Sequence, residues 1–401
     1  MREVPTPNYE YEIEKLVRAY KRAVSDILRE LDRLDLTDIS RANAQAALAE
    51  VARILSSLNE ESALWVAENI PKAALDGVAG TIFALGVADT LEEARTIAKF
   101  NRMNKAMVDA IIADTQSDLL AVTQNVERRV RAAVRQVTGE SLRANMAKGI
   151  NGRRTINRDT LEGLRKKLGD SVSTGIIDAA GRRWKPEVYV DMVTRTKMMA
   201  AKNEAVTNEA LARNAYYAVI SSHGAKDACR FHEGRIIKLS QDVPGNYPTY
   251  EQLRSSGQIW HPNCRHTLSP VRNPDRLPEN VRRSSGLAEH PLPNYSTAIL
   301  PKEKITGYAL NKEHPSGKDK AVAFEKALGY TQENYRDLMQ NVKANLPKFD
   351  AKVKPPNKFG ERYEVVMDLV GPNGKTAKVL TGWIVEFGKV TPRLTTIHID
   401  K

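Results

Sequence analysis

Apolar residues at helical spacing run through most of the first 180 residues of this 401-residue chain. Between Ile13 and Leu34 they recur at intervals of three and four, with charged residues in the positions between them. This spacing places the apolar side chains on one face of a helix. The same rhythm returns over residues 40–58, 107–137 and 159–168. We therefore expect a mostly α N-terminal body over residues 1–180. Its helices should pack against one another or against partner subunits, and they carry no catalytic signature.

Two local signals predict where helices of this region begin and end. Thr90-Leu-Glu-Glu93 has the residue types of a capping box, in which the Thr hydroxyl and the Glu carboxylate each satisfy a free backbone N–H. Gly169 follows the run over residues 159–168, and it is expected to end that helix because glycine readily adopts the left-handed backbone of a C-cap. A further helix is expected over residues 187–214.

Residues 181–275 are expected to form a small α+β middle module. Short runs of β-forming residues lie at 215–222 and 234–239. The segment 241–257 is rich in Pro, Gly, Tyr and Ser, which predicts an ordered loop. Five prolines between Pro270 and Pro293, together with Ser284-Ser-Gly286, predict a linker over residues 276–298 and a domain boundary.

The last hundred residues, 299–401, predict a separate α+β domain. Helices are expected over 318–328 and 331–346, the second with Thr331 as its N-cap. Alternating apolar and polar residues predict strands over 362–370, 376–387 and 392–399. Gly371-Pro-Asn-Gly374 is a strong turn signal between the first two strands. This order gives an antiparallel sheet with helices on one face.

Charge is distributed unevenly along the chain. Residues 1–180 contain equal numbers of basic and acidic side chains, so the whole formal net charge of +12 lies in the remaining residues. A basic C-terminal half indicates a polyanionic partner such as nucleic acid, although a solvated basic surface has the same composition. No apolar run is long enough to span a bilayer, and the N-terminus has no signal-peptide core, so we expect a soluble protein made in the cytoplasm, without a membrane partner.

Two short stretches hold both cysteines and three of the seven histidines of the chain. The first runs from Asp227 to Gly234 and the second from His261 to His266. Cysteine and histidine are the ligands that zinc prefers in closed structural sites. One interpretation is therefore a structural zinc site, which would stabilise a loop-rich module with little core. The proposed ligands are Cys229, His261, Cys264 and His266, with His223 and His232 as spare candidates.

Three other interpretations compete with zinc. The first, on an equal footing with zinc, is that these are ordinary residues of a turn, in which His261-Pro262 fixes the backbone and Asn263 caps the turn. A disulfide between Cys229 and Cys264 is disfavoured in a cytoplasmic chain, and two cysteines cannot form a disulfide framework. A nucleophilic Cys264 paired with His261 or His266 is also disfavoured, because close neighbours in an irregular loop rarely adopt triad geometry.

An ordered set of short motifs resembles the phage minor capsid protein 2 group, within the wider Mu F-like head morphogenesis proteins. The motifs are Tyr189 to Thr196, Asp227-Ala-Cys229-Arg230, Glu233-Gly-Arg-Ile236 and Trp260-His-Pro-Asn-Cys-Arg-His266. Many relatives have Cys in the place of His266. The resemblance covers roughly residues 1–275. It implies a minor component of the virion, associated with portal and major capsid proteins and needed for head assembly or carried inside the head.

The C-terminal residues carry a second, weaker resemblance. Ile305-Thr-Gly-Tyr308, His314-Pro-Ser-Gly317, Leu328-Gly-Tyr330 and Pro392-Arg-Leu-Thr395 look like a small domain found in phage head proteins and polymorphic toxins. Its expected layout is similar to the barnase–EndoU–colicin–RelE ribonucleases. This resemblance implies a metal-independent ribonuclease and, with it, a cognate immunity protein.

RNA cleavage without metal needs a base, an acid and cations for the phosphate. His314, Lys320, Arg393 and Thr395 are the residues of suitable type, and we predict them as the catalytic set. Each also has a simpler interpretation: His314-Pro315 starts a turn, Lys320 faces solvent, and Arg393 pairs with Glu386. The alternative to a nuclease is a purely structural head protein whose basic half contacts packaged DNA through its phosphates.

Overall fold

The computed structural model describes residues 2–36, 40–146, 158–173, 176–177 and 181–400. The chain forms two compact units. The helical unit comprises Pro7–Val78 and Ala98–Ala205, and the mixed unit comprises Met1–Thr6, Ala79–Ile97 and Val206–Lys401. The expected fold class is confirmed: a helical N-terminal region, small sheets in the middle and an antiparallel sheet at the C-terminus. Among the described residues, no helix is both long and apolar enough to cross a membrane.

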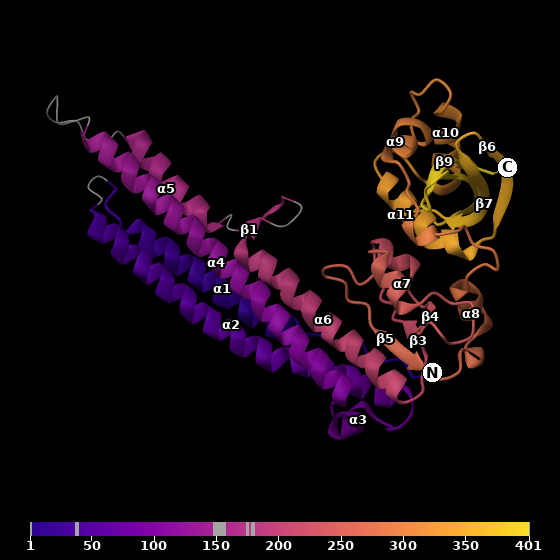
Figure 1. Cartoon of the computed structure of the whole chain (residues 1–401), viewed down its shortest axis with the longest axis horizontal. Helices are drawn as coiled ribbons and strands as arrows, with labels where there is room; N and C mark the ends of the chain where they lie inside the picture. Colours follow the sequence, from indigo (N-terminus) through magenta and orange to yellow (C-terminus); the bar gives the residue numbers. More distant parts are fainter. Residues whose placement is uncertain (1, 37–39, 147–157, 174–175, 178–180, 401) are drawn as a thin grey trace. The chain divides into compact units, whose positions relative to one another are not determined.

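Long helices α1 (Glu10–Asp32), α2 (Arg41–Ala84) and α4 (Arg102–Met146) dominate the helical unit (Figure 1). Polar contacts tie them together. The Ser62 hydroxyl of α2 donates to Tyr20 of α1 at 3.3 Å, and Thr123 of α4 donates to Asn59 of α2 at 2.6 Å. The apolar rhythm of the sequence forms the buried face of α1, as predicted. The helix expected over residues 40–58 is much longer and continues through Pro71.

The unit is completed by α5 (Arg158–Ser173), the short hairpin β1 (Ile176–Ile177) and β2 (Arg183–Trp184), and α6 (Pro186–Ala212). The prediction that Gly169 ends a helix is wrong, because α5 continues to Ser173. Another glycine has a structural role. A Cβ atom on Gly77 of α2 would lie 2.4 Å from the backbone oxygen of Lys202 in α6, so the two helices approach more closely than any larger residue permits.

In the mixed unit, α3 (Leu91–Ile97) begins after Thr90, as the capping signal predicts. The Glu93 N–H donates to the Thr90 hydroxyl at 3.1 Å, whereas the Glu93 carboxylate accepts from Asp89 rather than from Thr90. A three-stranded antiparallel sheet follows, with β3 (Tyr217–Ile220) between β4 (Ile236–Lys238) and β5 (Leu268–Val271). This small sheet supports the loops that carry the Cys/His residues.

Two segments expected to be irregular contain helices. The segment 241–257 includes α7 (Tyr250–Ser255), which begins with a complete capping box formed by Thr249 and Gln252. The expected linker includes α8 (Glu279–Ser285), and Leu292 within it is fully buried. The Pro-rich segment 276–298 therefore contains regular structure and a buried side chain, although its composition is typical of a linker.

The C-terminal domain is a four-stranded antiparallel sheet, in the order β6 (Ala351–Asn357), β7 (Gly360–Val370), β8 (Thr376–Glu386) and β9 (Pro392–Ile399). Helix α10 (Lys318–Leu328) was predicted with its observed bounds. Helix α11 (Tyr335–Asn345) begins after Asn334, so the prediction of Thr331 as its N-cap is wrong. The remaining helical elements before α10 are α9 (Lys302–Lys304) and a π-helical turn, Ile305–Ala309.

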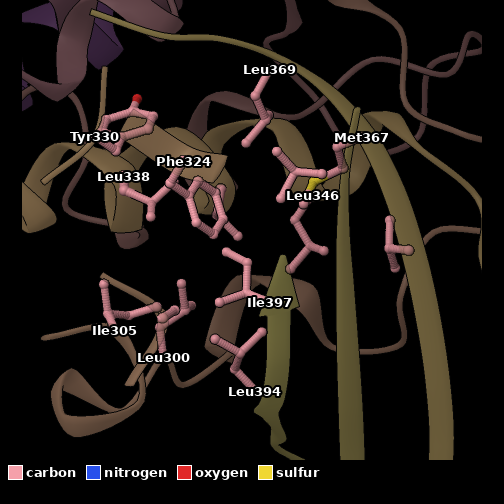
Figure 2. Packing of buried hydrophobic residues seen from close by; sticks show 14 of the residues in the cluster. Leu300, Ile305, Phe324, Tyr330, Leu338, Leu346, Met367, Leu369, Leu394 and Ile397 are labelled. Carbon is pink, nitrogen blue, oxygen red and sulfur yellow. The ribbon is translucent and has the colours of Figure 1, made fainter. Parts of the chain in front are cut away.

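One face of this sheet and the helices enclose the apolar core shown in Figure 2. Phe324 of α10 and Leu338 of α11 are fully buried against Met367 of β7 and Leu394 of β9. The predicted hairpin is confirmed, with β7 and β8 paired along their full length from Gly360↔Glu386 to Val370↔Thr376. The sequence prediction missed β6, an edge strand with two consecutive prolines, Pro355 and Pro356.

Candidate functional site

A short 3-10 turn, Ala228–Phe231, positions the first cysteine. Asp227 caps this turn, because its carboxylate accepts the Cys229 N–H at 3.0 Å. Cys229 is only 1% exposed, and its thiol faces the backbone oxygen of Gln258 at 3.6 Å. The Asp227-x-Cys229 spacing in the sequence is therefore a local capping motif that aims the sulfur inward.

A tight turn positions the second cysteine. Trp260 and Asn263 have left-handed backbone angles, φ +56° and +67°, and the Cys264 N–H donates to the His261 oxygen at 2.9 Å. The Trp260 N–H in turn points at the Cys264 sulfur at 3.3 Å. Asn tolerates the left-handed region better than other side chains, which accounts for its place in the turn. His261, Pro262 and Asn263 therefore form a turn, as the turn interpretation expects, and this turn also positions the Cys264 sulfur.

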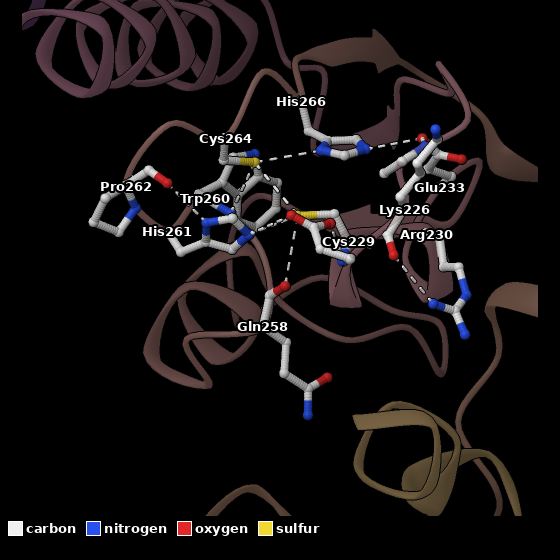
Figure 3. A network of polar contacts seen from close by, with 12 residues as sticks. Lys226, Cys229, Arg230, Glu233, Gln258, Trp260, His261, Pro262, Cys264 and His266 are labelled. Atoms are coloured by element: carbon white, nitrogen blue, oxygen red, sulfur yellow. Dashed lines mark hydrogen bonds and ion pairs between the residues drawn. The ribbon is translucent and has the colours of Figure 1, made fainter. Parts of the chain in front are cut away.

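Figure 3 shows the two cysteine segments facing one another. The Cys229 sulfur lies 3.6 Å from the Cys264 sulfur and 3.1 Å from His261 Nε2. The Cys264 sulfur lies 3.3 Å from His266 Nδ1. Contacts therefore link all four residues that are proposed as zinc ligands, although Cys229 and Cys264 lie 35 positions apart in the sequence.

The separations among Cys229, His261 and Cys264 fit three corners of a tetrahedral metal site. With Zn–S of about 2.3 Å and Zn–N of about 2.0–2.1 Å, neighbouring ligand atoms stand roughly 3.3–3.8 Å apart. The ligand atoms of Cys229, His261 and Cys264 all lie within 4.8 Å of one another. His266 contacts Cys264 but does not belong to this close set; its ligand atoms group instead with those of His223 and Glu233. Two sulfurs and two imidazoles are a donor set that zinc takes in closed structural sites.

In each histidine of the group, the nitrogen that faces away from the cysteines has an oxygen partner. His261 Nδ1 lies 2.9 Å from the Pro262 backbone oxygen, and Glu233 Oε1 lies 3.1 Å from His266 Nε2. Asp227 Oδ2 instead lies 3.3 Å from His261 Nε2, the nitrogen that faces Cys229. Glu233 Oε1 also accepts the backbone N–H groups of His223 and Ala225, each at 3.0 Å. Carboxylates behind histidine ligands are typical of metal sites, because they fix the tautomer and the ring orientation.

His223 and His232, the spare candidates, lie to either side of this group. The ring of His223 stacks on that of His266 with centroids 4.1 Å apart, and His223, Glu233 and His266 form a second set of close ligand atoms. His232 instead bonds to Gln258 and Arg235. His223 is thus adjacent to the proposed ligands, whereas His232 belongs to a separate polar cluster.

A hydrogen bond between the two sulfurs shifts the pKa values of the two thiols in opposite directions. The hydrogen bond from Cys229, followed by that with His266, lowers the pKa of Cys264 to about 4, although burial opposes the shift. The neighbouring Cys264 thiolate, with burial, raises the pKa of Cys229. Burial alone would lower the pKa of His266, but contacts with Cys264 and Glu233 raise it. An anionic sulfur is therefore already favoured in this group.

The geometry disfavours both a disulfide and a nucleophilic cysteine. Both cysteines are free, and 3.6 Å between the sulfurs is far from the roughly 2.05 Å of a disulfide. Cys264, His266 and Glu233 do line up in the order of a nucleophile, a base and an orienting acid. However, Cys264 is 6% exposed and its sulfur is surrounded by Cys229 and the Trp260 N–H. A substrate has no access to it in this arrangement.

The four residues predicted for nuclease chemistry are divided between two places. His314 and Lys320 share the ring of Tyr308: the His314 ring packs edge-on at 4.9 Å, and Lys320 Nζ lies 4.8 Å from the ring centroid. Arg393 instead forms a two-bond ion pair with Glu386, at 2.6 and 3.1 Å. Thr395 is exposed on β9.

The Lys320 ammonium donates to Thr396, at 3.2 Å, and not to Thr395. A register shift between Gly382 and Trp383 places Thr396 opposite Gly382, which leaves Thr395 as the extra residue of a bulge. The neighbouring His398 was missed. Its Nδ1 is buried without a hydrogen-bond partner, and burial, together with the Lys320 charge, lowers its pKa. The sequence around His398 gave no sign of a functional role, because a single histidine in a strand matches no catalytic motif.

Comparisons with known proteins are sparse. A family model described as phage minor capsid protein 2 matches residues 10–279. A second, a domain of unknown function (DUF6883), matches residues 291–401. No curated protein and no solved structure matches the chain significantly.

Proposed function

The chain belongs to the phage minor capsid protein 2 family, and from this we propose that it is a portal-associated minor protein of the phage head, carried in the virion. The observation that carries the proposal is a match that runs from α1 through both Cys/His segments. The long helices offer extended surfaces for other head proteins, among which we propose the portal and major capsid proteins. The gap between the two family matches, residues 280–290, falls inside the predicted linker, which supports separate roles for the segments it joins.

A stop codon in place of Tyr11 in the phage genome tests this role. We expect particles with absent or defective heads, restored when the full chain is supplied from a plasmid. A stop codon in place of Pro291 is the matched control, because it retains the whole region matched by the capsid family. We expect that control to assemble heads. Normal infectious particles from the early stop would contradict the proposal.

For the Cys/His group we propose a structural zinc site formed by Cys229, His261, Cys264 and His266. Zinc bound there would cross-link two loops and contribute directly to folding. The group uses four protein ligands, which leaves no open position for catalysis. We expect about one zinc per purified chain and its loss in Cys229→Ser. His290→Ala is the control, because His290 is exposed and distant in sequence from the ligands. A metal-free wild-type chain would exclude the site.

For the C-terminal domain we propose phosphodiester cleavage of RNA, supported by the group of Lys320, Thr396, His398 and the nearby His314. A neutral His398 would act as the base, and Lys320 would bind the phosphate. Full chain incubated with RNA should cleave it, and His398→Ala or Lys320→Ala should abolish cleavage. Lys326→Ala, on the exposed side of α10, should not. Intact RNA with the wild type favours instead the structural alternative, in which the basic half contacts packaged DNA.

A further inference from the structure

Arg235 is a buried cation that has no carboxylate partner among the residues that the structure describes. It precedes β4 and is 2% exposed. Its Nη1 contacts His232 Nδ1 at 3.2 Å, whereas Nε and Nη2 are buried without a hydrogen-bond partner. Burial lowers the pKa of Arg235 to about 10, and the Tyr295 phenol, not a carboxylate, opposes the shift. Burying an unpaired guanidinium is costly, so this side chain needs an explanation.

The two unsatisfied atoms form one edge of the guanidinium. Nε–H and the adjacent Nη2–H lie side by side and point in the same direction, which is the fork that binds two oxygens of a carboxylate or a phosphate. His232 is not a counter-charge for Arg235, because a histidine side chain is either neutral or positive. Burial, with the Arg235 charge, lowers the pKa of His232 to about 3, so its ring is neutral and adds no further positive charge. The other ring nitrogen, Nε2, bonds to Gln258 Oε1 at 2.8 Å, which leaves Nδ1 to accept from Arg235.

Arg235 lines a cavity of about 40 Å³ in the mixed unit. No Asp or Glu is among the lining residues. The polar residues Ser256, Ser296 and Gln252 line it, together with Lys343. At roughly 10–15 Å³ of such space per water molecule, the volume holds about three waters or one small oxyanion, and it is too small for a nucleotide.

A second lysine adds positive charge. Lys348 keeps part of its surface exposed, but burial, with the Arg235 charge, lowers its pKa to about 7. The Lys348 charge also acts on His232. Arg235 and Lys343 line the cavity, and Lys348 adds to the positive potential at Arg235 and His232. An anion with several oxygens would satisfy the Arg235 fork and reduce the mutual repulsion of these cations.

We propose that this cavity binds a single phosphate group, held by the Nε and Nη2 edge of Arg235, with Lys343 at the cavity lining and the Ser296 hydroxyl as a further donor. Gln258 connects this site with the Cys/His group. Its backbone oxygen faces the Cys229 sulfur (Figure 3), and its side chain bonds to His232. The phosphate has two sources of the same chemistry: free inorganic phosphate, or the terminal phosphate of a nucleic acid.

Thermal unfolding of the full chain tests the proposal. Inorganic phosphate should raise the unfolding temperature above that in chloride at equal ionic strength, because a ligand of the folded state stabilises it. A 5′-phosphorylated DNA oligonucleotide, compared with the same strand lacking the phosphate, distinguishes the two sources. A gain with the phosphorylated strand assigns the site to nucleic-acid ends, and a gain with inorganic phosphate alone assigns it to the free ion. No gain with either probe overturns the proposal.

Variants locate the site. Arg235→Met should weaken phosphate binding on the order of 10- to 100-fold, as expected for losing a charge-assisted two-bond contact. Should this variant fail to fold, Lys343→Gln serves in its place, since Lys343 is exposed and its replacement leaves the core intact. It should weaken binding several-fold, whereas the exposed Lys326→Gln should not. Unchanged phosphate affinity in Lys343→Gln, or in a folded Arg235→Met, would overturn the assignment.

Discussion

Replacing Cys264 by serine removes one sulfur from the proposed zinc site and changes one atom of the side chain. The Cys264 sulfur contacts the Cys229 sulfur at 3.6 Å and His266 Nδ1 at 3.3 Å, so its loss breaks the link between both halves of the group. We expect the variant to lose zinc, since a harder and less acidic oxygen is a poor replacement for a thiolate.

The size of the effect follows from linkage. Zinc at a free concentration of about 1,000 times its Kd would stabilise the folded state by about 4 kcal/mol. For a folding unit of about 200 residues, each kcal/mol changes the Tm by roughly 2–4 °C. Cys264→Ser should therefore lower the Tm of the zinc-loaded chain by roughly 8–16 °C.

Differential scanning calorimetry with and without a chelator is the assay. The wild type should lose the same 8–16 °C or so when zinc is removed. Cys264→Ser should not respond to the chelator, and His290→Ala should behave as the wild type. Two results would refute the reasoning: a wild-type Tm that the chelator leaves unchanged, or a Tm of zinc-loaded Cys264→Ser equal to that of the wild type.

Three further predictions concern the rest of the chain. Gly77→Ala should destabilise the helical unit by about 2–4 kcal/mol, because the new methyl group would lie 2.4 Å from the Lys202 oxygen. Gly163→Ala, in open space on α5, is the control and should stabilise the unit by about 0.5–1 kcal/mol. Equal Tm values for the two variants would contradict the packing. Phe324→Ala should cost about 3–5 kcal/mol in urea unfolding, because the ring is fully buried, and a cost under about 1 kcal/mol would mean that the core is not packed as described. Burial lowers the pKa of Lys202 to about 8, so the folded state gives up its proton first and stability should rise as pH increases from 8 to about 10.5. Lys202→Met should remove this rise, and an unchanged pH profile would contradict the shift.

The local parts of the fold were predictable from the sequence. Helix α10 and the β7–β8 hairpin have strong short-range signals, an amphipathic run and the Gly371–Gly374 turn. The sequence also contained the signal for α7, since Thr249 and Gln252 have capping-box spacing, but the surrounding Pro and Gly content favoured a loop. Edge strand β6 gave little signal because its prolines and lysines are residues that edge strands tolerate and central strands do not.

The site was predictable only in its residue types. Cys229 and Cys264 approach one another because β3 pairs with both β4 and β5, a tertiary event that no spacing in the sequence describes. The contact of Lys320 with Thr396 rather than Thr395 depends on a bulge, which shifts the register by one residue. Arg235 was not predicted at all, because a single basic residue before a strand gives no sign that it will be buried without a partner.

The most direct test of a head protein is its presence in the particle. Quantitative mass spectrometry of purified virions should find peptides from both residues 10–279 and residues 291–401, at a small fraction of the major capsid protein. Virions without these peptides, from cells whose lysate contains the chain, would contradict the account.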